Sequence, residues 1–185
     1  VLVIGHANKA NVSRAGIFRY SSELLLGMES SSKANIFPFI QDWNYAEHAQ
    51  NELDSLRGVN SKRPKFKYSN KLLKYNQSSF KNFLKQFSTC NSLNTIFHTP
   101  FQFIPDSVRD SNIRSCIVTI HDMIPNIFPE TFPDETIRQF HLLLENLKKE
   151  DHVICVSEST KRDFVKYNSN IPEENVHVTH LASSK

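Results

Sequence analysis

The chain has little glycine and cysteine, and it lacks several common functional signatures. Only 4 of its 185 residues are glycine, and neither the G-x-G-x-x-G of dinucleotide-binding loops nor the G-K-[ST] of P-loops occurs. Its 3 cysteines form no C-x-x-C pair, and Cys116 and Cys155 lie in apolar runs. This pattern indicates small buried thiols in a reducing compartment. No apolar run approaches the length of a membrane span, so we expect neither a transmembrane helix nor a signal sequence.

Acidic residues are absent between Asp54 and Asp106, whereas basic residues are frequent there, above all in the segment from Lys62 to Lys85. One interpretation is a positive surface for an anionic partner, such as a membrane, a lipid diphosphate or a nucleic acid. The alternative is a core-facing helix with a solvated lysine rim. The alternative rests on apolar residues at helical spacing, namely Phe80, Phe83, Leu84 and Phe87.

Short apolar runs alternate with longer amphipathic segments along the whole chain. The runs predict buried strands at Val1–Gly5, Asn35–Ile40, Thr95–His98, Cys116–Ile120, His152–Val156 and Val176–Thr179. The amphipathic segments predict helices at Gly16–Met28, Ala46–Leu56, Lys71–Phe87, Asp134–Lys149 and Glu158–Tyr167. This alternation predicts an α/β fold with a Rossmann-like, doubly wound and mainly parallel sheet. Ser157 is suited to capping the last of these helices.

The segment VTIHDMIPNIFPE, residues 118–130, places His121 and Asp122 at the end of a predicted strand. Functional groups of doubly wound sheets collect beyond the carboxyl ends of the strands, and His98 ends another strand in the same way. His121 and Asp122 are therefore candidate catalytic residues, with the imidazole bonding a substrate hydroxyl. Alternatively, Asp122 bonds nearby backbone N–H groups and stabilises a turn. We expect Pro125 to end regular structure.

Two further interpretations concern ligands at these strand ends. In SRAGIFRYSSELL, Gly16 opens a predicted helix whose free N–H groups suit a phosphate, with Arg19 one turn in. A simple turn before a helix explains the same glycine. A metal site formed by His98, His121 and Asp122 is conceivable, but their spacing fits no common metal-binding motif.

Four segments in the expected order resemble the N-terminal domain of family 4 glycosyltransferases, which have the GT-B fold. They are SRAGIFRYSSELL, FHTPFQFIP, IVTIHDMIPNIFPETF, and EDHVICVSESTKRDF followed by IPEENVHVTHLA. The last pair is the most specific, because bacterial members commonly read V-S-E-x-[ST]-K-x-D after a strand, then a short turn with Pro and Glu before the next strand. The resemblance covers nearly the whole chain.

The resemblance implies a retaining transferase that moves a sugar from a nucleotide sugar to a glycan or lipid-linked acceptor, with no cofactor and no bound metal. By motif position, His121 reaches the transferred sugar, and Asp122 supports it. Ala15 and Gly16 lie against the donor diphosphate and the acceptor, with Arg19 close by. His98 joins this acceptor and diphosphate site.

The resemblance also implies a domain organisation and a location. Residues 1–185 correspond to the acceptor-side domain, and we expect the C-terminal nucleotide-sugar-binding domain, with its paired glutamates, to be missing from this chain. The protein is expected in the cytoplasm, at the inner face of the membrane if the basic segment docks there, and without a nucleic-acid partner. Two other functions stay open: a non-catalytic Rossmann-like module that binds an anionic partner, and a small metal-dependent hydrolase.

Overall fold

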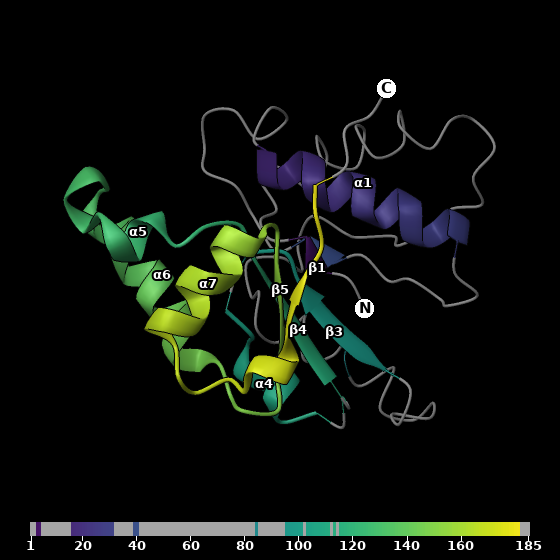
Figure 1. The fold of residues 1–185 in the computed structure, drawn as a ribbon. Helices are drawn as coiled ribbons and strands as arrows, with labels where there is room; N and C mark the ends of the chain where they lie inside the picture. Colours follow the sequence, from purple (N-terminus) through teal and green to yellow (C-terminus); the bar gives the residue numbers. More distant parts are fainter. Residues whose placement is uncertain are drawn as a thin grey trace, which may run out of the picture.

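The computed structural model of the chain describes residues 3–4, 16–31, 39–40, 84, 95–101, 103–111, 113 and 115–181. In this part, parallel strands alternate with helices (Figure 1). The strands are β1 (Val3–Ile4), β2 (Phe39–Ile40), β3 (Ile96–Thr99), β4 (Ser115–Ile120), β5 (His152–Cys155) and β6 (Val176–Val178). The α-helices are α1 (Gly16–Ser31), α4 (Asp106–Arg109), α5 (Ile124–Ile127), α6 (Asp134–Asn146) and α7 (Glu158–Tyr167). The 3-10 helices are η4 (Pro129–Thr131) and η5 (Glu173–Asn175).

The strands confirm the predicted α/β fold with a parallel sheet. Four strands pair in the order β3-β4-β5-β6, and every pair is parallel. The short strands β1 and β2 also pair in parallel, and β1 contacts β3. The described strands thus form a four-stranded parallel sheet and a separate parallel pair that contacts it at β3.

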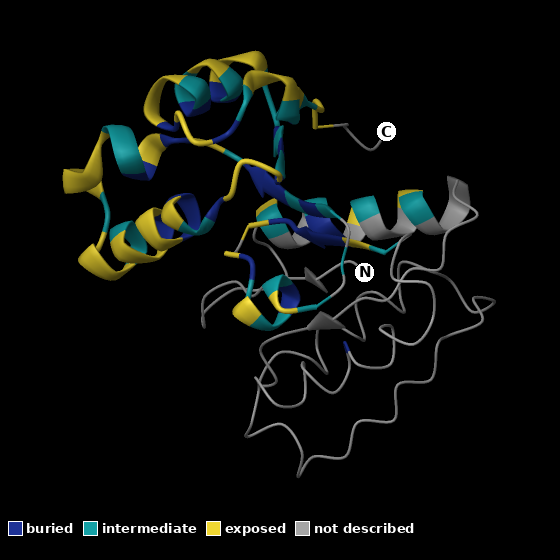
Figure 2. Cartoon of the chain, turned by 90° about the horizontal axis from the view of Figure 1, so that it is seen from below, coloured by how far each residue is buried: buried dark blue, intermediate teal, exposed yellow. Residues whose placement is uncertain are grey.

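Helices cover both faces of the sheet, as the alternation of side chains along β4 shows. Val118 and Ile120 join the buried apolar core together with Phe140 of α6 and Phe164 of α7. Thr119 points to the opposite face, where Tyr20 of α1 contacts it. Figures 1 and 2 accordingly show α1 on one side of the sheet and α6 with α7 on the other. This burial on both faces explains why the strands appear in the sequence as continuous apolar runs.

Local signals set the bounds of the C-terminal helices. The hydroxyl of Ser157 accepts a hydrogen bond from the backbone N–H of Thr160, which confirms the predicted cap of α7. The expectation for Pro125 is wrong, because this residue lies in the first turn of α5. Proline is tolerated there, since the first N–H groups of a helix have no partner within the helix.

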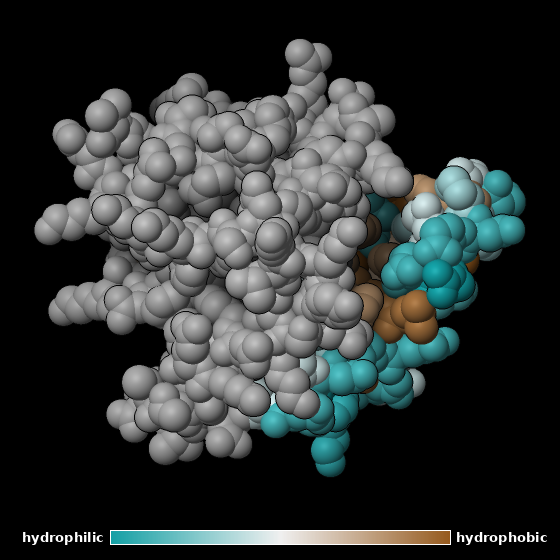
Figure 3. Space-filling view, turned by 180° about the vertical axis from the view of Figure 1, so that it is seen from behind, coloured by the Kyte–Doolittle hydropathy of each residue, from teal (hydrophilic) through white to brown (hydrophobic). Residues whose placement is uncertain are grey.

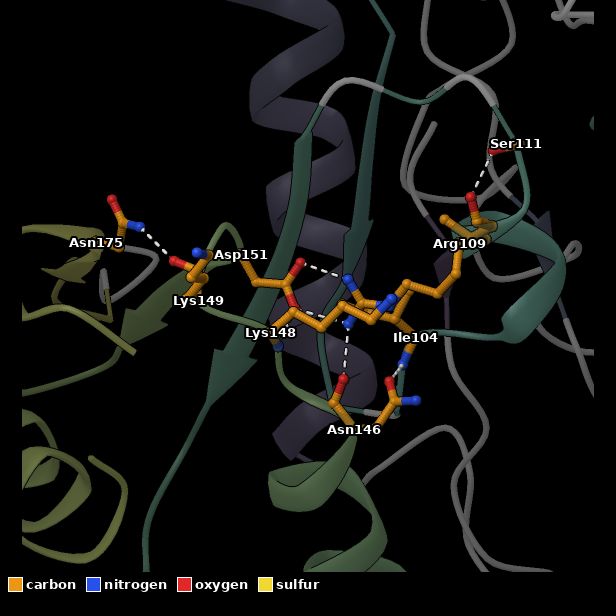
Figure 4. A network of polar contacts seen from close by, with 9 residues as sticks. Ile104, Arg109, Ser111, Asn146, Lys148, Lys149, Asp151 and Asn175 are labelled. Atoms are coloured by element: carbon orange, nitrogen blue, oxygen red, sulfur yellow. Dashed lines mark hydrogen bonds and ion pairs between the residues drawn. The ribbon is translucent and has the colours of Figure 1, made fainter. Parts of the chain in front are cut away.

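A buried polar network ties α4 to the turn that leads from α6 into β5 (Figure 4). Both terminal nitrogens of Arg109 donate to the carboxylate of Asp151 at 2.6 Å, and one of them also donates to the carbonyl of Asn146 at 2.8 Å. The backbone N–H of Lys148 donates to the same carboxylate. The network fixes the turn from α6 into β5 at the edge opposite the strand ends that carry His98 and His121.

Several predictions fall outside the described residues. These are the helix at Ala46–Leu56, all of Lys71–Phe87 except the buried Leu84, the basic segment Lys62–Lys85, and Cys90. Cys116 and Cys155 are confirmed as buried free thiols.

The described surface is mixed in character. Figure 3 shows hydrophobic side chains lying between hydrophilic areas on one of its faces. Phe101 and Phe128 are among the large apolar side chains that remain exposed. None of the described helices combines the length and the apolar character that crossing a membrane requires.

Candidate functional site

The candidate site lies where β3 and β4 end. His98 is the third of the four residues of β3, and His121 follows β4 directly. Helix α1 contributes Tyr20, whose hydroxyl contacts Thr119 and whose ring contacts His121. Ligands of doubly wound folds bind in the crevice outside the carboxyl ends of the strands. The fold therefore brings two of the predicted site residues, His98 and His121, to the position that the sequence indicated.

His98, Thr119 and Tyr20 form a chain of hydrogen bonds across the sheet. The Nε2 atom of His98 lies 2.8 Å from the hydroxyl oxygen of Thr119, which lies 3.2 Å from the hydroxyl oxygen of Tyr20. Burial lowers the pKa of His98 to about 4, so its imidazole is neutral at pH 7. Burial likewise raises the pKa of Tyr20 above its usual value. This chain is uncharged at neutral pH, and it fixes α1 to the sheet.

His121 is half-buried and is held from two sides. Its Nε2–H donates to the carbonyl oxygen of Pro100 at 2.9 Å. The ring of Tyr20 meets the imidazole edge-on, with the ring centroids 5.0 Å apart and the planes at 89°. Burial lowers the pKa of His121, against smaller opposing effects of the Pro100 hydrogen bond and the Asp122 carboxylate. The imidazole is therefore neutral at pH 7 and can exchange hydrogen bonds with a hydroxyl group.

Asp122 is exposed and has a local partner. Its carboxylate accepts a hydrogen bond of 2.9 Å from the backbone N–H of Ile124, which opens α5. This is the turn-stabilising contact that the sequence allowed as an alternative to catalysis. Through this hydrogen bond, Asp122 stabilises the loop that follows His121.

The start of α7 supports His121 from a third direction. The hydroxyl of Thr160 donates to the backbone carbonyl of His121 at 3.2 Å. The same hydroxyl is 2.9 Å from that of Ser157, the residue that caps α7. The end of β4 is thus bonded to the first turn of the helix that follows β5.

The predicted phosphate loop is described only from Gly16 onward. Gly16 opens α1 and is exposed, and a Cβ atom added to it would meet no other atom within 4 Å. Space alone therefore does not require glycine there. Arg19 lies in the first turn of α1, but its side chain and all of Ala15 are outside the described residues.

The geometry also bears on a metal site. Among the described residues, no three histidine, cysteine or acidic side chains come close enough together to hold a metal ion. The Nε2 atoms of His98 and His121 are engaged by Thr119 and by Pro100, respectively. His98, His121 and Asp122 thus lie at the ends of neighbouring strands, but their side chains do not come close enough together to hold a metal ion.

Sequence reasoning missed Tyr20, Thr119 and Thr160, which hold the two histidines. Each lies inside a quoted segment, in α1, β4 and α7, respectively. A signal existed for Thr119, because it is a polar residue within an apolar strand and it immediately precedes Ile120 and His121. Its partner could not be identified, because Tyr20 is 99 residues away in the chain.

Comparison of the chain with protein-family profiles, with curated proteins and with solved structures found no match.

Proposed function

We propose that this chain is the acceptor-side domain of a retaining glycosyltransferase with the GT-B fold. It would transfer a sugar from a nucleotide sugar to a glycan or a lipid-linked acceptor, together with a second domain that binds most of the nucleotide sugar. The proposal rests on the four sequence segments that resemble family 4 glycosyltransferases. The four-stranded parallel sheet with its helices is compatible with one Rossmann-like domain of such an enzyme.

The structural observation that best supports the proposal is the environment of His121. Glycosyl transfer passes through a transition state with positive charge on the sugar and a departing diphosphate. A protonated imidazole next to the sugar would oppose that positive charge, whereas a neutral one can bond a sugar hydroxyl without this cost. Burial lowers the pKa of His121, so the neutral form is present at pH 7. Its place at the carboxyl end of β4 is where a doubly wound fold receives a ligand.

The remaining residues have supporting roles in this proposal. Asp122 holds the turn after His121 through the N–H of Ile124. Gly16 opens α1 at the side of the site that would receive the donor diphosphate, with Arg19 in the same turn. His98 acts from the interior, because it is buried against Thr119. The enzyme would work in the cytoplasm, and its basic segment would meet an anionic membrane surface.

The test is His121→Ala in the complete polypeptide that carries this chain together with its donor-binding domain. We expect the release of nucleoside diphosphate from the nucleotide sugar to fall by about a hundredfold, the typical effect of deleting one hydrogen bond to a transition state. His141→Ala is the matched control, because His141 is exposed on α6. Transfer close to wild type in His121→Ala, with the control equally active, would refute the role of His121.

A further inference from the structure

The two ring nitrogens of His121 have different surroundings. Nε2 lies 2.9 Å from the carbonyl oxygen of Pro100, which can only accept a hydrogen bond. The proton of the neutral imidazole is therefore on Nε2, and Nδ1 carries a lone pair. Nδ1 has no hydrogen-bond partner in the part of the chain that the structure describes.

Nδ1 is also accessible. Among the described residues, the only buried side-chain nitrogen or oxygen without a partner is Nε of Arg109. Nδ1 of His121 has no partner among them either and is not one of these buried atoms, and His121 as a whole is only half-buried. His121 thus presents a single open atom to a ligand, and this atom accepts hydrogen bonds.

Tyr20 fixes the ring that presents this atom. It meets the imidazole edge-on, at a centroid distance of 5.0 Å, in the arrangement that aromatic rings favour. Tyr20 is itself anchored through its hydroxyl to Thr119, which is bonded to the buried His98. A turn of the imidazole about its bond to Cβ would break the Pro100 bond and lose the contact with Tyr20.

We propose that Tyr20 is a positioning residue for His121, and that Tyr20 and the Pro100 carbonyl hold the imidazole with Nδ1 as an open hydrogen-bond acceptor. The ligand group that meets Nδ1 must then donate a hydrogen. A sugar hydroxyl can do so, whereas a fully ionised phosphate oxygen has only lone pairs to offer. The assignment to a sugar hydroxyl rests on the proposed function, but the state of the imidazole does not. In the transferase, His121 would therefore contact the sugar and not the diphosphate.

The experiment is nitrogen NMR of the imidazole rings in the ¹⁵N-labelled chain, with the His121 signals identified by their loss in His121→Gln. At neutral pH we expect Nε2 to be protonated and Nδ1 to be unprotonated in the wild-type chain. A protonated Nδ1 would overturn the proposal without the need for any further variant.

Two variants separate the ring of Tyr20 from its hydroxyl. Tyr20→Phe keeps the ring contact and should preserve the wild-type tautomer. Tyr20→Leu should allow the Nδ1–H tautomer to appear and should raise the pKa of His121 toward that of an ordinary histidine, because the imidazole becomes better hydrated. Tyr167→Leu is the matched control, since Tyr167 is exposed on α7. If Tyr20→Leu leaves both the tautomer and the pKa of His121 as in the wild type, Tyr20 does not position this ring.

An activity measurement distinguishes this proposal from the proposed function. In the complete polypeptide, transfer should fall below the pKa of His121, and Tyr20→Leu should move this acid limb to higher pH. A loss of stability alone would not move the limb. The expected tautomer without transfer from any nucleotide sugar would refute the transferase and leave the positioning of His121 standing.

Discussion

Replacing Arg109 with methionine should destabilise the fold strongly, because it leaves the Asp151 carboxylate buried without its cation. The Arg109 side chain is 10% exposed and that of Asp151 only 2%. Asp151 accepts two hydrogen bonds of 2.6 Å from Arg109 and one from the backbone of Lys148, so the variant retains a single donor (Figure 4). Breaking a buried ion pair in this way costs about 3–5 kcal/mol.

Arg138→Met is the matched control for this prediction. Arg138 binds the carboxylate of Glu135 with two nitrogens as well, but the two side chains are 62% and 64% exposed. Such an exposed pair contributes less than about 1 kcal/mol. Each arginine thus binds a carboxylate with two nitrogens, and the two pairs differ strongly in burial.

Urea unfolding followed by circular dichroism measures both variants. With a slope of about 1–3 kcal/mol per molar urea, Arg109→Met should lower the midpoint by more than about 1 M, and Arg138→Met by much less. Arg109→Met/Asp151→Asn should be more stable than Arg109→Met, because no unpaired charge is then buried. Equal midpoint shifts for the two arginine variants would refute the assignment of the buried pair.

Three further predictions concern the site and the core. Because burial lowers the pKa of His98 from 6.5 to about 4, the unfolded chain binds its proton more tightly, and the free energy of unfolding should decrease as pH falls through this interval. The decrease is about 3 kcal/mol by linkage. A chemical unfolding series at several pH values should show it in the wild type, and His98→Gln should show a smaller decrease, to which the lowered pKa of His121 still contributes. Asp122→Ala should lose about 1 kcal/mol of stability with the Ile124 hydrogen bond, and Asp122→Asn less, with both retaining far more transferase activity than His121→Ala; inactivity of Asp122→Asn would assign the carboxylate to catalysis instead. Burial raises the pKa of Cys116 to about 11 and that of Cys155 to about 12, so in a Cys90→Ser chain neither thiol should react with an alkylating reagent at pH 8 until urea unfolds the protein.

Elements with strong local signals could be predicted from the sequence. The predicted helix Glu158–Tyr167 coincides with α7, because the cap at Ser157 and the helical period are both local. The predicted strand Cys116–Ile120 lies within β4, which begins one residue earlier, because a continuous β-branched run has few alternatives to a buried strand. The short helix α5 was missed, since Pro125 reads equally as the end of one element or the first turn of another.

Contacts between distant residues could not be predicted. Arg109 and Asp151 are 42 residues apart, and nothing near either residue identifies the other as its partner. The same holds for Tyr20 and Thr119, which together determine how His121 is held. The sequence indicated that His98 and His121 come to the same edge, because His98 ends one predicted parallel strand and His121 directly follows another. It did not indicate that His98 is buried and bonded to Thr119.

Sugar transfer is tested most directly by incubating the complete polypeptide with a panel of nucleotide sugars and measuring nucleoside diphosphate release. One donor should be consumed, its sugar should appear in the product with the anomeric configuration of the donor, and His121→Ala should abolish most of the signal. Failure of every nucleotide sugar to be consumed, with the protein folded, or inversion of the anomeric configuration, would contradict the assignment to retaining glycosyltransferases.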